Sequence, residues 1–182
     1  MSGEMRDNPV YWITGLSGAG KTTLGRAMVE KLRLSGVPVV HLDGDEIRAA
    51  LNERDAFSPT LRQQMAEKYM RLCALFASQG LTVVCTTISL YPEVHIWCRE
   101  NIENFCLVYL RASKHMLQTR NSKGLYDTDK RNKDVVGVDI PVSEPWNPDI
   151  TINVDIPASP KDLAGIVLAR KGWASHRLDH AS

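Results

Sequence analysis

The sequence predicts an α/β fold with a central, mainly parallel, five-stranded sheet flanked by helices. Five short apolar segments alternate with segments of helical periodicity, which is the pattern of a parallel sheet covered by helices. The segment 15–22, GLSGAGKT, fits G-x-x-x-x-G-K-[ST], the phosphate-binding loop of nucleoside-triphosphate enzymes. An apolar segment precedes it and a helical pattern follows it, which is the context that this loop requires. Together these features indicate a P-loop kinase fold.

Length and composition fit a single domain over residues 1–182 with a substantial core, because 43% of the 182 residues are hydrophobic and 24% are charged. A formal net charge of +1 gives no general attraction for nucleic acid. No apolar signal core or run of about 18 apolar residues is found, so we expect a cytoplasmic protein with no membrane partner. The cysteines form no C-x-x-C pair, which favours reduced core thiols: Cys73, Cys85, Cys98 and Cys106.

The first half of the sheet is predicted from two apolar segments. Val10–Thr14 is apolar, β-branched and aromatic, so it is typical of a buried strand. Thr23–Leu34 spaces its apolar residues for one helix face. Val37–Asp43 is the second strand, and Asp45–Leu51 is predicted as a short helix.

The middle of the chain repeats this alternation. Ser58 followed by proline predicts the start of a long helix that ends near Gly80, because serine caps helices and glycine ends them. Leu81–Ile88 and Phe105–Leu110 are apolar and predict the third and fourth strands. Pro92–Asn101 is predicted as the helix between them.

The last third contains a long polar segment between two regular elements. Ser113–Thr119 predicts a short helix, Ile150–Asp155 the last strand, and Ser159–Trp173 a closing helix. Residues 120–149 are polar and punctuated by glycine and proline, so we interpret them as a mobile lid over the site, because loops this long in a compact domain are usually functional. Residues 174–182 are expected to form a flexible tail.

The phosphate loop indicates ATP and Mg²⁺ as cofactors. Gly15, Gly18 and Gly20 free the backbone so that its N–H groups can surround phosphate oxygens. Lys21 supplies a cation for the β- and γ-phosphates, and the Thr22 hydroxyl suits Mg²⁺, which prefers oxygen ligands. The predicted ATP-binding residues of the loop are Gly15, Leu16, Ser17, Gly18, Ala19, Gly20, Lys21, Thr22 and Thr23.

Charged residues follow the second strand, where ligands of open parallel sheets bind. The second strand ends in Asp43-Gly44-Asp45, and Asp45 is therefore expected to face the phosphate loop. A carboxylate there can orient an acceptor hydroxyl, accept its proton or hold a Mg²⁺-bound water, although Asp45 is also a good helix N-cap. Arg48 and Arg62 suit phosphate or sulfate oxygens because the guanidinium group is a planar fork, or they are solvated helix charges.

Six segments together resemble the adenylylsulfate kinase family, which uses ATP to phosphorylate the ribose 3′-hydroxyl of adenosine 5′-phosphosulfate. They cover most of the chain from Val10 to Asn153. Their sequences are VYWITGLSGAGKTTLGRAMVEKL, VVHLDGDEIRAAL, AFSPTLR, TTISLYPEVHIWCREN, KGLYDTDKR and VVGVDIPVSEPWNPDI. The run LDGD-x-x-R followed by FS, with KGLY and a later G-x-D-x-P, is far more specific than the phosphate loop alone.

The resemblance implies roles at the matching positions. Asp45, Lys21 and Lys123 are implied to be catalytic, and Arg120 is implied to lie near the ATP adenine. Phe57 matches an aromatic residue that stacks on the acceptor base. The implied acceptor-binding residues are Asp43, Asp45, Arg48, Phe57, Arg62, Ile88, Ser89, Lys123, Gly124 and Leu125. A homodimer is also implied, and in some members the serine at position 89 can be phosphorylated.

Three positions depart from the family's pattern on the acceptor side. Met65 replaces an asparagine that contacts the acceptor, and Leu90 replaces a proline. Val135 replaces the lid phenylalanine that normally encloses the adenine opposite the residue at Phe57. Stacking contributes about 1–3 kcal/mol per base, so its loss predicts weaker adenine binding or a different base, unless valine is simply tolerated.

Four functions therefore remain open on the sequence. The first is the 3′-kinase of adenosine 5′-phosphosulfate. The second is a related kinase of cytidine diphosphoramidate, which acts in capsule modification at the same hydroxyl. The third is a non-catalytic nucleotide-binding module, against which the retained Lys21, Asp45 and Lys123 argue. The fourth is a gluconate or shikimate type of kinase, which the KGLY segment makes less fitting.

Overall fold

The computed structural model describes residues 8–53, 58–120 and 144–170. One five-stranded sheet has the strand order β2-β3-β1-β4-β5, and all four pairings are parallel. The strands are β1 Val10–Gly15, β2 Val39–Asp43, β3 Thr82–Thr86, β4 Phe105–Arg111 and β5 Ile150–Asn153. The predicted parallel α/β fold is therefore confirmed.

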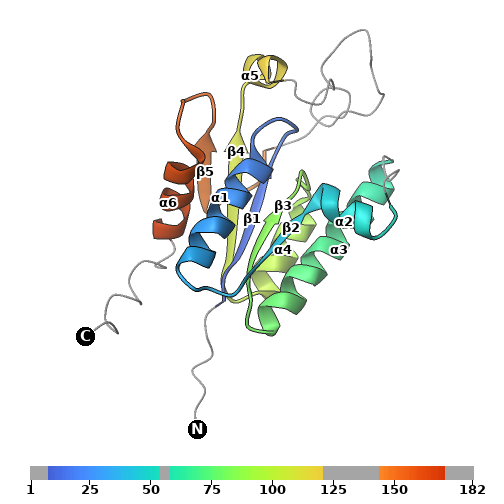
Figure 1. The fold of residues 1–182 in the computed structure, drawn as a ribbon. Helices are drawn as coiled ribbons and strands as arrows, with labels where there is room; N and C mark the ends of the chain where they lie inside the picture. The colour runs from blue at the N-terminus through green and yellow to red at the C-terminus, as the bar shows by residue number, and fades with distance from the viewer. Residues whose placement is uncertain (1–7, 54–57, 121–143, 171–182) are drawn as a thin grey trace, which may run out of the picture.

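Helices cover both faces of this sheet (Figure 1). Two of them, α1 and α6, pack on one face, and α3 and α4 pack on the other. The helices are α1 Lys21–Leu34, α2 Gly44–Ala50, α3 Pro59–Ser78, α4 Pro92–Asn101, α5 Lys114–Thr119 and α6 Pro160–Arg170. The loop between β1 and α1 lies at the carboxyl end of the central strand, at the top of Figure 1.

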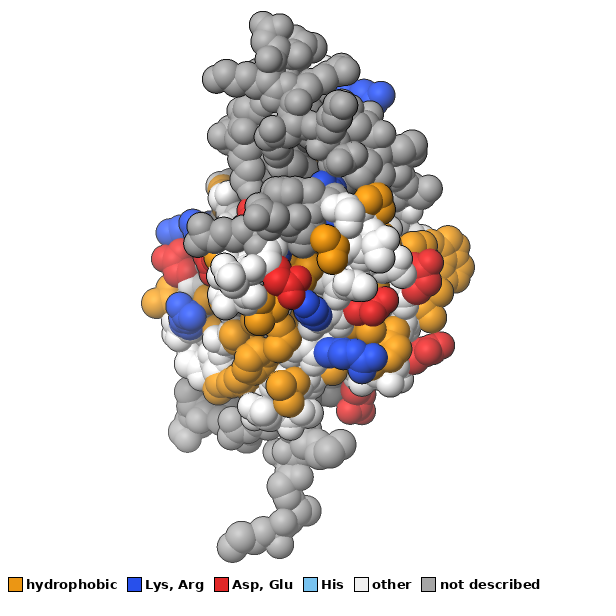
Figure 2. Space-filling view, turned by 90° about the vertical axis from the view of Figure 1, so that its right-hand side faces the viewer, with side chains coloured by type: hydrophobic (Ala, Val, Ile, Leu, Met, Phe, Trp, Pro, Cys, Tyr) orange, Lys and Arg blue, Asp and Glu red, His pale blue; other side chains and the backbone are white. Residues whose placement is uncertain are grey.

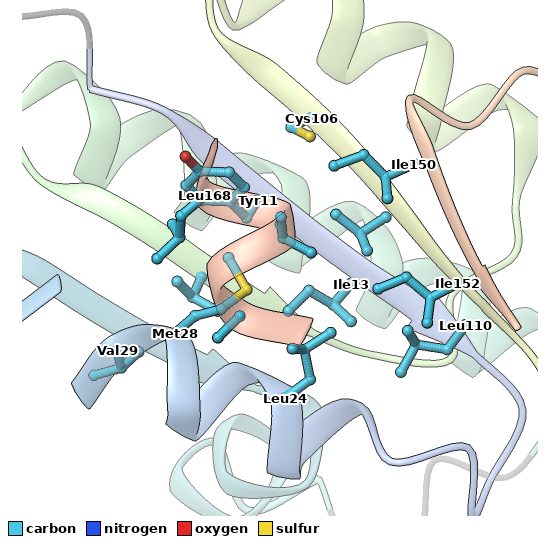
Figure 3. Packing of buried hydrophobic residues seen from close by; sticks show 14 of the residues in the cluster. Tyr11, Ile13, Leu24, Met28, Val29, Cys106, Leu110, Ile150, Ile152 and Leu168 are labelled. Atoms are coloured by element: carbon cyan, nitrogen blue, oxygen red, sulfur yellow. The ribbon is translucent and has the colours of Figure 1, made fainter. Parts of the chain in front are cut away.

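The core on the α1 side fixes the helix that carries the phosphate loop. Its buried side chains come from α1, α6 and the facing side of β1, β4 and β5, as Figure 3 shows. Leu24, Met28 and Leu32 lie on one stripe of α1 and are at most 2% exposed. Ile13 of β1 and Ile150 of β5 lie opposite them in the same cluster. This packing holds the start of α1 at a fixed height above the sheet.

The core on the other face contains residues of α3 and α4 packed on the reverse side of the sheet. Trp12, Met65 and Cys98 belong to it and are at most 2% exposed. Met65 therefore serves as a core residue in this chain, beside Tyr69 of the same helix. All four cysteines are buried thiols, as the sequence predicts.

Local sequence signals explain most helix starts. The Ser58 hydroxyl accepts the N–H of Leu61, and the Ser159 hydroxyl accepts the N–H of Asp162, as predicted for N-caps. The alternative role of Asp45 as an N-cap is wrong, because Asp43 is the N-cap of α2 and accepts the N–H of Asp45 at 3.0 Å. Consequently, α2 begins one residue before the predicted start.

Three strands are shorter than predicted, and the last of them ends at Asn153 instead of at residue 155. The second begins at Val39 instead of at residue 37, because Pro38 has no N–H for a ladder. The third ends at Thr86 instead of at residue 88, where its neighbour β2 also ends at Asp43. Asp149 precedes the last strand and joins it to β4, since its carboxylate accepts the N–H of Leu107 at 2.7 Å and pairs with Arg99 at 3.0 Å.

Several predicted features lie outside the described residues. These are Phe57, most of the predicted lid, the end of the closing helix beyond residue 170, and the tail 174–182. Among the residues that are described, none of the helices combines the length and apolar character needed to cross a membrane. On the face shown in Figure 2, basic and acidic side chains are interspersed with hydrophobic ones, which agrees with the small net charge.

Candidate active site

A cleft of about 790 Å³ lies beyond the carboxyl ends of the strands. It is lined by the phosphate loop, the start of α2, the end of β3, Arg120 and the segment after β5. The lining residues that the sequence predicted are Ser17, Gly18, Ala19, Gly20, Lys21, Thr22, Thr23, Asp43, Asp45, Arg48, Ile88 and Arg120. The phosphate loop and the acidic residues after β2 therefore face one shared space, as the position of ligands in open parallel sheets predicts.

The phosphate loop has the backbone shape that its glycines permit. Gly20 precedes α1 with φ 94°, in the left-handed region, and no side chain caps the helix. A Cβ at Gly15 would lie 2.6 Å from the carbonyl oxygen of Leu110, so only glycine allows this approach to β4. Lys21 Nζ donates to the carbonyl oxygen of Leu16 at 2.7 Å. The open N-terminus of α1 and a nearby ammonium group form an arrangement suited to phosphate.

The carboxylate of Asp43 joins the phosphate loop to the sheet. Its Oδ2 accepts the hydroxyl of Thr22 at 2.7 Å and the hydroxyl of Thr86 at 2.8 Å. Its Oδ1 accepts the N–H groups of Asp45 and Glu46 at 3.0 and 3.4 Å. Burial alone would raise the pKa of Asp43, but these four hydrogen bonds outweigh burial and lower the pKa. Asp43 is therefore held as a carboxylate at neutral pH.

Thr86 extends this network to a histidine that sequence reasoning missed. His41 Nε2 lies 3.1 Å from Thr86 Oγ1. Because the Thr86 hydroxyl donates its proton to Asp43, it accepts from His41, so His41 carries a proton on Nε2. Burial lowers the pKa of His41 despite the nearby Asp43 charge. Gly25 of α1 makes room for this contact, because a Cβ there would lie 2.5 Å from Thr86 Cγ2 and 2.8 Å from His41 Nε2.

The donor atoms at this point fit Mg²⁺. The Thr22 hydroxyl and the Asp43 carboxylate are hard oxygen ligands that lie side by side in the cleft. The described part of the chain contains no cluster of three His, Cys, Asp or Glu residues that would hold a metal without a substrate. Phosphate oxygens and water would therefore complete the coordination, as is usual for Mg²⁺ bound with a nucleotide.

Arg48 lines the side of the cleft that is predicted to bind the acceptor. Its Nη2 pairs with Oδ1 of Asp45, and its Nη1 donates to the hydroxyl of Tyr69 at 3.3 Å. That hydroxyl donates to the carbonyl oxygen of Gly44 at 3.1 Å. Tyr69 is 1% exposed, and burial raises its pKa although Arg48 opposes the rise. Tyr69 is a second residue that the sequence did not reveal, because it resembles a helix core residue.

Other predicted acceptor residues lie in different places. Ile88 lines the cleft, and its carbonyl oxygen accepts the Thr14 hydroxyl at 3.1 Å. Ser89 is buried, and its hydroxyl shares a hydrogen bond of 2.8 Å with Thr87. Arg62 is half-buried, near Tyr91, whose pKa is raised by burial and partly lowered again by that charge. Neither Ser89 nor Arg62 is among the described residues that line the cleft.

Three predicted site residues of the lid, and the lid valine, are not described by the structure. They are Lys123, Gly124, Leu125 and Val135. Their predicted roles therefore remain predictions, as does that of Phe57.

The opposite end of the cleft is apolar. Arg120 lines it together with side chains that follow the carboxyl ends of β4 and β5, and Ile156 among them is 66% exposed. The residues that sequence reasoning missed here are Leu110, Val154, Ile156, Ala158, Pro160 and Leu163. The rule that ligands bind beyond the carboxyl ends of parallel strands directed attention to Asp45. Applied to the fourth and fifth strands, the same rule would have found these residues. An exposed apolar wall beside a guanidinium group suits the flat face of a base.

Comparison with known proteins decides the family. The sequence profile described as Adenylylsulphate kinase matches residues 7–153. The chain belongs to the adenylylsulphate kinase family. A cytidine diphosphoramidate kinase of Campylobacter jejuni is 40% identical over 153 residues, covering 82% of this chain and 88% of that protein. An adenylyl-sulfate kinase of Gloeothece citriformis is 34% identical over 147 residues, covering 80% of this chain and 84% of that protein.

Solved structures agree with this assignment. The APS kinase of Mycobacterium tuberculosis in complex with AMPPNP and APS superposes with a TM-score of 0.80 at 27% identity, covering 90% of this chain and 96% of that one. The predicted P-loop kinase fold and the predicted enzyme class, a phosphotransferase, are thereby confirmed. The similar proteins thus include kinases whose names give two different acceptors, cytidine diphosphoramidate and adenylyl sulfate.

Proposed function

We propose that this chain is an ATP-dependent kinase that phosphorylates the ribose 3′-hydroxyl of adenosine 5′-phosphosulfate and so takes part in sulfate activation. One observation carries the proposal. Lys21 and Thr22 line the same cleft as Asp45 and Arg48. The first pair suits the phosphates of a nucleotide donor, and the second suits an acceptor that carries a hydroxyl group and an anion. Membership of the adenylylsulphate kinase family supports this acceptor.

The proposed mechanism relies on positioning and electrostatics. Lys21 and the N-terminus of α1 bind the β- and γ-phosphates, and Thr22 and Asp43 would hold Mg²⁺ directly or through water. When bound, Mg²⁺ neutralises charge that develops on the phosphates. Asp45 orients the 3′-hydroxyl for in-line attack on the γ-phosphorus and accepts its proton. The bond to the β–γ bridging oxygen breaks, ADP leaves, and the proton passes from Asp45 to solvent.

The acceptor's charged tail and the lid have further proposed roles. Arg48 and Arg62 bind the phosphosulfate, Phe57 stacks on the base, and Ile88 lines the acceptor site, supported by the buried Ser89 that follows it in the chain. Lys123 approaches the phosphates from the lid when residues 120–149 close. The neighbouring lid residues Gly124 and Leu125 contact the acceptor. Closure would exclude water, which competes with the acceptor hydroxyl.

A second acceptor, cytidine diphosphoramidate, is favoured by observations at two positions. Met65 stands where the family usually has an acceptor-binding asparagine, and it is 2% exposed in an apolar core. Val135 stands where the family has the phenylalanine that encloses adenine. The 40% identity to a cytidine diphosphoramidate kinase points in the same direction. Both acceptors present a ribose 3′-hydroxyl and an anionic tail, so the mechanism is the same for either.

A parallel phosphoryl-transfer assay tests both proposals. Purified protein is incubated with ATP, Mg²⁺ and either adenosine 5′-phosphosulfate or cytidine diphosphoramidate, and the phosphorylated product is separated by chromatography. Turnover of only the cytidine compound would refute the first acceptor and support the second. Asp45→Asn should abolish transfer to the true acceptor, whereas Glu46→Gln removes an adjacent carboxylate and should retain it. Activity of Asp45→Asn near that of the unaltered protein would show that the catalytic role is wrong.

Assembly and location are also proposed from the family. We expect one domain over residues 1–182 that forms a homodimer and works in the cytoplasm, where ATP is available. Sedimentation equilibrium would contradict the dimer if it gave the mass of one 20.3 kDa chain at micromolar concentration.

A further inference from the structure

The two terminal nitrogens of Arg48 have partners of different kinds. Nη1 contacts Tyr69, whose hydroxyl is fixed to the backbone of Gly44 in the protein interior. Nη2 pairs with Asp45, whose side chain is 54% exposed. One partner is therefore buried and hydrogen-bonded to the backbone, while the other is a surface carboxylate on the same short helix as Arg48. Tyr69 therefore anchors the guanidinium group at Nη1, whereas the carboxylate at Nη2 can be exchanged for another anion.

This ion pair joins the two residues that the proposed reaction uses separately. Arg48 binds the acceptor's anionic tail, and Asp45 orients the acceptor's hydroxyl. While they pair with each other, the Nη2 edge of Arg48 is occupied and Asp45 is partly neutralised. An exposed ion pair is weak, whereas phosphate or sulfate oxygens match the guanidinium fork with two parallel hydrogen bonds. An incoming anionic tail is therefore able to displace the carboxylate.

We propose that the Arg48–Asp45 ion pair is a latch that the acceptor opens. The acceptor's anionic tail replaces Asp45 on Arg48, and the released carboxylate turns to the acceptor's hydroxyl. Tyr69 is the positioning residue that holds the guanidinium group in place during this exchange. The inference rests on the proposed function, because it assumes an acceptor that carries an anion. Its consequence is that Asp45 becomes available when an acceptor is bound, so transfer of the γ-phosphoryl group to water is suppressed in the absence of the acceptor.

Binding measurements test the competition directly. The affinities of adenosine 5′-phosphosulfate and cytidine diphosphoramidate are measured by calorimetry without ATP. Asp45→Asn should tighten binding of the true acceptor by about 2- to 5-fold, the range expected for an exposed ion pair. Glu46→Gln is the matched control, because it removes an equal charge from the same cleft but pairs with Arg26 at 3.5 Å instead of with Arg48. The gain should vanish when Arg48→Met is added.

Equal tightening by both single variants would show simple charge repulsion and overturn the latch. Unchanged affinity in Asp45→Asn would overturn it too. If neither compound binds or is phosphorylated, the proposed function fails, and the latch is then decided by a second assay that needs no acceptor.

That assay measures hydrolysis of ATP in the absence of acceptor. Water attacks the γ-phosphorus, the bond to the β–γ bridging oxygen breaks, and the proton of the water passes through Asp45 to solvent. Arg48→Met should raise this rate by about 2- to 5-fold, the range expected for loss of an exposed ion pair, and adding Asp45→Asn should remove the increase. An unchanged or lower rate in Arg48→Met would overturn the latch. Tyr69→Phe should raise KM for the acceptor without changing KM for ATP, and equal changes in both would overturn the role of Tyr69.

Discussion

Replacing Gly25 by alanine places a methyl group where α1 touches the sheet. The new Cβ would lie 2.5 Å from Thr86 Cγ2 and 2.8 Å from His41 Nε2, whereas carbon atoms normally approach to about 3.5–4.0 Å. The helix or both side chains must therefore move by about 1 Å, and such overpacking costs about 1–3 kcal/mol. Alanine also stabilises a helix interior by about 1 kcal/mol relative to glycine. We expect a net loss of about 0–2 kcal/mol in the free energy of unfolding.

Gly165 provides a matched control in α6. A Cβ there would meet only the flexible Nζ of Lys31, at 3.4 Å, so Gly165→Ala should stabilise the protein by about 1 kcal/mol. Because helix propensity contributes equally at both sites, the difference between the two variants isolates the crowding at Gly25. Urea denaturation of both variants measures this difference, which we expect to be about 1–3 kcal/mol. A Gly25→Ala variant that is stabilised as much as Gly165→Ala would refute the close packing.

The same substitution should affect nucleotide binding. Helix α1 begins at Lys21, so a movement of the helix away from the sheet carries Lys21 and Thr22 with it. A misplacement of 1 Å can cost up to about 100-fold in rate, so kcat/KM for ATP should fall by about 10-fold or more. The Gly165→Ala variant should show unaltered kinetics, since Gly165 does not line the cleft and its new methyl group would meet only the flexible end of Lys31. If Gly25→Ala loses stability but keeps its kcat/KM for ATP, then the packing at Gly25 does not control the position of the phosphate loop.

Three further predictions concern polar side chains that make hydrogen bonds in or beside the core. Burial lowers the pKa of His95 to about 4, so the unfolded chain takes up a proton first as the pH falls below about 6.5. The free energy of unfolding should therefore drop by about 2 kcal/mol between pH 8 and pH 5. An equal drop in the His95→Gln variant would show that His95 is not the group responsible. Thr86→Val removes one hydroxyl from Asp43 and should raise the Mg²⁺ concentration needed for half-maximal activity, whereas an unchanged Mg²⁺ dependence would show that the hydroxyl is dispensable. Asp149→Ala removes the acceptor of the Leu107 N–H and should lower the free energy of unfolding, measured in urea, by about 1–3 kcal/mol. A decrease below about 0.5 kcal/mol would show that this hydrogen bond contributes little to stability.

The sheet and the donor end of the site were predictable because their signals are local. Val10–Gly15 is a continuous apolar run, and the phosphate loop that follows has a fixed spacing of glycine, lysine and threonine. The start of α3 was equally readable, since a serine cap and a proline at the first turn lie next to each other in the chain. Strands, helix starts and loops whose signals lie within about ten consecutive residues were thus predicted, with small errors at the ends of the elements.

Contacts between distant parts of the chain could not be read in this way. His41 reaches Thr86, 45 residues away, and Tyr69 reaches Arg48, 21 residues away. In the sequence, His41 is one polar residue in a strand and Tyr69 one aromatic residue in a helix, so neither differs from an ordinary structural residue. The register that pairs Asp43 with Thr86 at the ends of β2 and β3 brings Thr86 to His41. The hydroxyl of Tyr69 reaches Arg48 because α3 lies beside α2.

The position of Asp43 has a consequence for how substitutions in this chain would be interpreted. One carboxylate starts α2, holds the end of β3 and receives the hydroxyl of the phosphate loop. Any replacement would therefore alter folding and nucleotide binding together, and a survey of variants scored by protein abundance would class the position as structural. Asp45, two residues later and exposed, would pass the same survey while losing activity. A survey that also scored activity would therefore be needed to separate the two aspartates, because only Asp43 joins folding to nucleotide binding.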